Sequence, residues 1–266
     1  MHRLVRIALF SILCVPVWAD DPAAAKTTAG DNVNPDEIIK KFAAKEKEFA
    51  LARDNYTYRQ TAKIQELDDS GEPGGKWEIV EDILFTPEGK RMEHVVRAPV
   101  STLQNLLLTP EDMEDLRNTQ PFVLTSDEVP LYEIRYLGKQ NADEISCYVF
   151  AVKPKKLIPG KRFFEGQIWV DDRDFQIVKT YGKAVGHQKK SEDQQFPKFE
   201  TLREQIDGKY WFPTYTHADD TLHFKDHDQK IRMLVTYKDY KKFEGKSTIH
   251  FGDVVEDKPK DQPKKP

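Results

Sequence analysis

The sequence contains little cysteine: two residues in 266, Cys14 and Cys147. Cys14 lies in a leader that we expect to be removed, so Cys147 remains alone and no internal disulfide is expected. Cys147 sits in the strand-like run ISCYVFAV, where a small buried hydrophobic residue fits. Stability must then come from core packing, and 38% hydrophobic residues suffice for one domain, or at most two small ones.

Several signatures of chemistry are also missing. The chain has no G-x-S-x-G, no phosphate-binding glycine loop, no H-E-x-x-H and no internal repeat. It also lacks an excess of positive charge, since 41 Lys and Arg stand against 45 Asp and Glu, for a net charge of -4. Binding of nucleic acid through its phosphates is therefore not expected.

The N-terminus lacks an apolar run long enough to cross a bilayer. Arg3 and Arg6 precede a short apolar core at 7–15, and a small-x-small site ends at Ala19. This pattern predicts a signal peptide at 1–19, cleaved after Ala19, and export to the periplasm. Lipidation of Cys14 is disfavoured, because a leucine stands before it where a lipobox has a small residue.

The remaining chain changes from helical to strand-like periodicity. After a flexible leader at 20–33, Asn34-Pro35-Asp36-Glu37 predicts the start of a helix that runs to about Arg53. Alternating apolar residues then predict a succession of strands. The expected strands are Tyr56–Ile64, Trp77–Phe85, Lys90–Arg97, Tyr132–Tyr136, Cys147–Lys153, two within Phe163–Lys183, Phe199–Ile206, Tyr210–His217, Leu222–Lys225 and Ile231–Tyr240.

An insert interrupts these strands. Residues 98–108 are apolar and irregular, and Thr109-Pro110-Glu111-Asp112 predicts a short helix to about Asn118. The acids of this helix are expected to be first-turn or exposed charges: Glu111, Asp112, Glu114 and Asp115. We assign 34–245 to one domain and 246–266 to a charged tail that is expected to be disordered.

Phe163–Lys183 reads as a hairpin about Asp172 and Arg173, with a four-residue loop in which Asp171 accepts backbone bonds. The pairing that this turn predicts gives one apolar and one mixed face, as a half-buried antiparallel sheet requires. The apolar face pairs Val170 with Phe175, Ile168 with Ile177 and Phe164 with Tyr181. A calcium loop at Asp171–Asp174 is disfavoured, because Gln176 stands where glycine is needed.

The strand count predicts an α+β, mostly β fold of about 10–11 antiparallel strands, which must curl or close to cover its apolar face. The densest polar cluster is HADDTLHFKDHD, residues 217–228. His217, Asp219, His223 and His227 could hold a metal, but the spacing matches no known ligand pattern and a solvated hairpin is favoured.

YTYRQTAKIQEL and, above all, F-x-G-x-IWVDDRDFQIVKTYGK resemble the outer-membrane lipoprotein carrier and sorting superfamily, LolA-like with LolB and RseB relatives. Gly166, Trp169, Asp171 and Asp174 carry the pattern, and the likeness covers most of 56–240. The resemblance implies an unclosed half-barrel with the N-terminal helix and the helical insert over its concave face. It also implies an apolar cavity for acyl chains and no catalysis, so no cofactor is expected.

Our first hypothesis is a non-catalytic periplasmic carrier or binding protein for lipoprotein acyl chains or other lipid, with membrane-associated donor and acceptor proteins as possible partners. The alternatives are an envelope stress-sensing module that detects mislocalised lipoproteins, and a metal-dependent enzyme at His217, His223 and His227. The insert would form a lid through Leu103, Leu106, Leu107, Met113 and Leu116. Acyl chains would contact Tyr56, Tyr58, Ile64, Trp77, Ile79, Ile83, Phe85, Tyr132, Ile134, Tyr136, Phe164, Ile168, Phe175 and Ile177.

Overall fold

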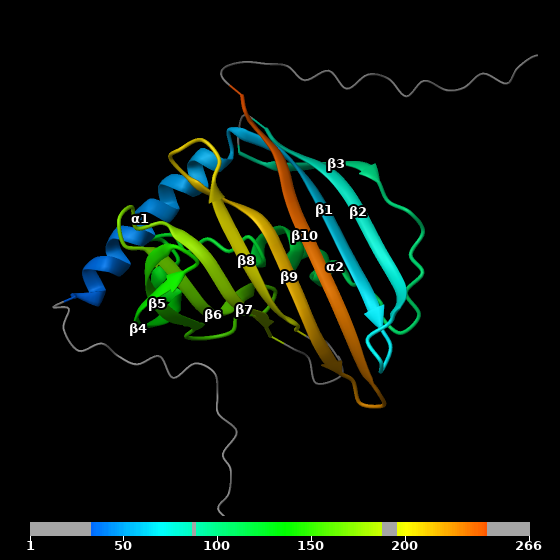
Figure 1. Cartoon of the computed structure of the whole chain (residues 1–266). Coiled ribbons are helices and arrows are strands. Elements are labelled where there is room, and N and C mark those ends of the chain that lie inside the picture. The colour runs from blue at the N-terminus through cyan, green and yellow to red at the C-terminus, as the bar shows by residue number, and fades with distance from the viewer. Residues whose placement is uncertain (1–32, 87–88, 188–195, 244–266) are drawn as a thin grey trace, which may run out of the picture.

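The computed structural model describes residues 33–86, 89–187 and 196–243. The predicted signal peptide, the charged tail and all of the leader except Val33 lie outside these residues. The described part is a long, curved antiparallel sheet with one long helix laid across it (Figure 1). None of the helices within these ranges combines the length and the apolar character that a bilayer crossing requires.

The sheet has ten strands in the order β3-β2-β1-β10-β9-β8-β7-β6-β5-β4, so β3 and β4 are its edges and it does not close. The mostly β, unclosed antiparallel fold is thereby confirmed. The strands are β1 (Tyr56–Leu67), β2 (Pro73–Phe85), β3 (Arg91–Arg97), β4 (Tyr132–Ala142), β5 (Ile145–Pro154), β6 (Arg162–Asp171), β7 (Ile177–Gly186), β8 (Lys198–Gln205), β9 (Trp211–His223) and β10 (Asp228–Lys242).

Helix α1 (Pro35–Arg53) begins where its sequence predicts. The side chain of Asn34 accepts a hydrogen bond from the Asp36 N–H at 3.1 Å, which satisfies one of the free donors of the first turn. The helix buries Ile38, Phe42 and Phe49 against the sheet. Much of the sheet's inner face is therefore covered by packed side chains rather than left open.

Two strands that the sequence predicts form a single strand in the structure, β9. Tyr210–His217 and Leu222–Lys225 were expected as separate strands because an acidic segment lies between them. However, β9 runs through this segment, and Asp219 pairs in register with Arg232 of β10. The carboxylate of Asp219 also accepts from Arg232 Nε at 2.8 Å on the exposed face. Acidic residues here are strand residues that face solvent.

The predicted register of the β6–β7 hairpin is wrong. Ile168 pairs with Thr180 instead of Ile177, and Tyr181, expected on the apolar face, is 44% exposed. The loop is larger than expected, because Phe175 takes a positive φ of 59° and its N–H donates to the Asp171 carbonyl at 3.1 Å. The predicted side-chain bond is present, with the Arg173 N–H donating to Asp171 Oδ1 at 2.7 Å.

Two apolar clusters lie on opposite faces of the sheet. The larger joins α1, the insert and most strands, and Ile168, Val170 and Ile177 all belong to it despite the altered register. The smaller contains Cys147 and Trp169 on the other face. Cys147 is fully buried, as expected, and burial raises the pKa of its thiol to about 11.

Candidate functional site

A cavity of about 550 Å³ lies between the insert, residues 98–131, and one end of the sheet. The antiparallel registers bring the last residues of β1, β7 and β9 and the first residues of β8 and β10 to this end. Its lining is mostly apolar: Ile64, Leu106, Leu107, Leu108, Leu116, Ala184, Pro197, Phe199, Leu222, Phe224, Ile231 and Met233, with Asn105, Thr109, Glu111, Asp112, Asp115 and Gln120.

The insert forms one wall through consecutive leucines and a short helical segment. Helix α2 (Pro110–Glu114) begins with a capping box, in which Thr109 Oγ1 accepts from the Asp112 N–H and Asp112 accepts from the Thr109 N–H. A π-helical turn, η1 (Asp115–Thr119), follows and places Leu116 inward with 2% exposure. Leu107 is 88% exposed, so an apolar side chain stands at the cavity rim in contact with solvent.

Glu66 anchors the start of this wall. Its carboxylate lies at the end of β1, is almost fully buried, and accepts from three successive backbone N–H groups. The distances are 3.0 Å from Gln104, 2.7 Å from Asn105 and 2.9 Å from Leu106. Charge-assisted bonds of this kind are stronger than neutral ones, so a segment without regular structure is held in one place.

Asp115 anchors the other end of the wall. It was expected as an exposed helix charge, but it is buried and forms a bidentate ion pair with Arg162 at the start of β6. Burial raises the pKa of the Asp115 carboxyl, and the Arg162 guanidinium opposes that rise. A second ion pair, from Arg117 Nε to Glu93 at 2.7 Å, ties the insert to β3. These contacts fix the wall to β1, β3 and β6 of the sheet.

The residues predicted to bind ligand lie in different parts of the fold. Ile64 alone among the predicted ligand-binding residues lines the cavity. Tyr56 packs with Phe49 and Phe212 in a separate cluster. The others belong to the main core or pack against it: Tyr58, Trp77, Ile79, Ile83, Phe85, Tyr132, Ile134, Tyr136, Phe164, Ile168, Phe175 and Ile177. Their contact with a ligand stays a prediction.

Of the predicted lid, Leu106, Leu107 and Leu116 line the cavity, whereas Met113 packs against the main core and Leu103 is half-buried away from the lining. Apart from Ile64, the sheet side of the cavity was missed. Alternating residues of β10, Ile231 and Met233, face it, and the alternation was visible in the sequence. What the sequence did not reveal is which end of the sheet the insert covers.

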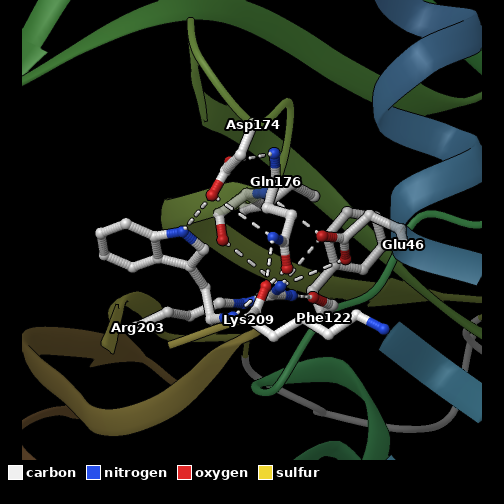
Figure 2. Close-up of polar contacts among 8 residues, drawn as sticks. Glu46, Phe122, Asp174, Gln176, Arg203 and Lys209 are labelled. Atoms are coloured by element: carbon white, nitrogen blue, oxygen red, sulfur yellow. Dashed lines mark hydrogen bonds and ion pairs between the residues drawn. The ribbon is translucent and has the colours of Figure 1, made fainter. Parts of the chain in front are cut away.

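A buried polar network lies apart from the cavity and ties α1 to the sheet (Figure 2). Arg203 Nη1 donates to both carboxylate oxygens of Glu46, at 3.1 and 3.2 Å, with side-chain exposures of 1% and 0%. The other nitrogen, Nη2, donates to the Phe122 carbonyl of the insert, and the Ile177 N–H donates to Glu46 Oε1 at 3.2 Å. Burial raises the pKa of Glu46 above its ordinary value, and the guanidinium opposes this.

Two histidines of the predicted polar cluster each lie beside a different aspartate. His223 Nδ1 lies 2.9 Å from Asp228, and His227 Nδ1 lies 2.8 Å from Asp226, all at the exposed β9–β10 hairpin. Within the described part of the chain, no three His, Cys, Asp or Glu side chains are grouped as metal ligands. Among the described lining residues of the cavity there is also no His, Cys or Ser.

No family model and no curated protein matches this chain. Several solved structures match it. An outer membrane lipoprotein-sorting protein domain from Vibrio parahaemolyticus is 12% identical over 79% of this chain and 95% of its own, with a TM-score of 0.35. MucB is 12% identical over 76% of this chain and 92% of its own, with a TM-score of 0.26.

A MucA/MucB complex from Pseudomonas aeruginosa is 11% identical over 79% of this chain and 99% of that chain, with a TM-score of 0.23. All three of these structures are at most 12% identical to this chain. At such TM-scores the likeness carries no argument about what this chain binds.

Proposed function

We propose that this protein is a non-catalytic periplasmic carrier or binding protein that holds an acyl chain of a lipid or lipoprotein in the cavity beneath the insert. The cavity is the observation that supports the proposal. Its volume of about 550 Å³ lies within the range of small-molecule sites. Its apolar lining and the leucine at its rim suit an aliphatic ligand with one end in water.

The binding energy would come from burial of methylene groups. Each contributes about 0.8 kcal/mol, so about ten buried methylenes give roughly 8 kcal/mol before the costs of association. A net value of about 8 kcal/mol would give a micromolar dissociation constant, and the costs of association make binding weaker than that. Two carboxylates of the wall are already engaged, since Asp112 caps α2 and Asp115 pairs with Arg162. They are thus better placed to hold the wall than to act on a substrate.

Filling the cavity tests the proposal. Ala184 of β7 lines it and is 5% exposed, so Ala184→Trp would occupy ligand space. The matched control is Lys183→Trp, because the neighbouring side chain points to the opposite face of the strand. Titration with a fluorescent fatty acid should show binding to the unmodified protein and the control, and at least tenfold weaker binding to Ala184→Trp.

Native mass spectrometry of protein purified from membranes provides the second measurement. We expect a lipid adduct on the unmodified protein and a reduced adduct on Ala184→Trp. A protein that carries no lipid and takes up no acyl probe would overturn the carrier proposal. Equal probe affinity in both tryptophan variants would place the binding site outside the cavity.

A further inference from the structure

The loop between β5 and β6, residues 155–161, exposes two adjacent apolar side chains among lysines. Its sequence is KKLIPGK, and Leu157 and Ile158 are 39% and 40% exposed. Lys155 and Lys156 precede this pair, and Lys161 follows it. Exposing adjacent large aliphatic side chains to water at a loop tip costs free energy, and such exposure is typical of an interaction site.

The apolar pair is held out by a defined turn. The Lys161 N–H donates to the Ile158 carbonyl at 3.1 Å, with Pro159 and Gly160 between them. Gly160 has φ of 75°, so the turn has the residues and the geometry of type II. At the other side, the Lys155 N–H donates to the Leu131 carbonyl at 2.9 Å, which fixes the loop base to the insert.

The charge of the loop is unbalanced. Lys156 and Lys161 have no carboxylate partner within the described residues, whereas the neighbouring Lys153 pairs with Glu133 at 3.1 Å. Lys161 Nζ lies 5.1 Å from the centre of the Phe163 ring and Lys155 Nζ donates to the Pro130 carbonyl at 3.0 Å, and neither contact supplies a negative charge. An apolar tip between lysines without a counter-charge matches the interface of a bilayer with anionic headgroups. Acidic hairpins at β1–β2 and β9–β10 would be repelled by such a surface, whereas the β5–β6 loop would be attracted to it.

The loop also lies at the cavity end of the sheet. Arg162 follows it directly and pairs with Asp115, which lines the cavity. The registers of β4 with β5 and of β6 with β7 place the loop at the same end as Ala184 and Gly186. A membrane bound at the loop would therefore lie beside the insert.

We propose that residues 155–161 form a membrane-docking site, in which Leu157 and Ile158 enter the interface of an anionic phospholipid bilayer and Lys156 and Lys161 contact its phosphates. Docking does not depend on what occupies the cavity. Together with the proposed function, it would bring the bilayer next to the cavity that receives the acyl chain.

Vesicle flotation of the full chain tests this. The protein should float with vesicles that contain phosphatidylglycerol, less with phosphatidylcholine alone, and less as salt rises. Leu157→Ser/Ile158→Ser should weaken partition at least tenfold on both vesicles. The matched control removes the exposed apolar residues Leu51 and Val100 as Leu51→Ser/Val100→Ser, and should leave partition unchanged.

Lys156→Gln/Lys161→Gln should weaken partition about 25-fold on anionic vesicles only, at about fivefold for each lysine. The equivalent change on β10, Lys238→Gln/Lys241→Gln, is its control. No flotation of the unmodified protein, or undiminished flotation of the serine variant, would overturn the docking site. Because Ala184→Trp leaves the loop intact, it should still float, so failure of the cavity and failure of the loop are distinguished.

Discussion

Replacing Glu46 by glutamine tests the network that joins α1 to the sheet. Glutamine keeps the volume and can still accept from the Ile177 N–H, but it removes the negative charge beside Arg203. An arginine does not release its proton, so its charge would stay buried without a counter-charge. Breaking a buried pair in this way costs about 3–5 kcal/mol of unfolding free energy.

Arg203→Met should behave differently. Here Glu46 can take up a proton, because burial raises its pKa and the opposing guanidinium is gone. At acidic pH the cost should be mainly the loss of donors to Phe122 and Ile177, about 1–3 kcal/mol. The pKa of Glu46 in the folded state lies above its unfolded value of 4.5. The free energy of unfolding of Arg203→Met should therefore fall as the pH rises from 4.5 through the folded-state pKa.

Urea unfolding followed by tryptophan fluorescence, repeated across pH, measures both effects. Relative to the unmodified protein, Glu46→Gln should be most destabilised above the folded-state pKa of Glu46, and the difference should shrink in acid, where that carboxyl is itself neutral. The control is Glu48→Gln, whose partner Lys45 lies 3.0 Å away at the surface and whose loss should cost under about 0.5 kcal/mol. A cost below about 1 kcal/mol for Glu46→Gln would refute the reasoning.

Three further predictions follow from single contacts. A Cβ at Gly182 would lie 2.3 Å from the Glu165 carbonyl oxygen, so Gly182→Ala should lower unfolding free energy by about 1–3 kcal/mol in urea; an unchanged midpoint would contradict this. Glu66→Ala should increase hydrogen exchange at 104–106, while exchange in α1 stays as it was; protection of 104–106 in the variant would count against the anchor. Asn34→Ala should cost about 1 kcal/mol in thermal unfolding, and a gain in stability would argue against the cap.

Local patterns were sufficient for the elements themselves. The cap at Asn34 located the start of α1, and alternation located the strands, because both depend on residues close in the chain. The hairpin register failed because the positive φ of Phe175 is not encoded by its residue type. The division of β9 failed because acidic residues suit a turn and an exposed strand face equally well.

The cavity was only partly predictable, for a different reason. The leucines of the insert were recognisable as an apolar face, and three of them line the cavity. Most of the strand aromatics predicted as ligand contacts belong to the main core or pack against it, and their contact with a ligand stays a prediction. Apolar character alone does not distinguish a side chain that packs against a helix from one that faces a cavity.

By itself, the sequence determined that this chain is a mostly β protein with one capped N-terminal helix and a helical insert. Those features follow from propensity and periodicity, which act over a few residues. Only the tertiary structure decided where the cavity lies, because the contacts of Glu66 with 104–106 and of Asp115 with Arg162 join residues far apart in the chain. Such pairings depend on how the sheet curves, and no local pattern records them.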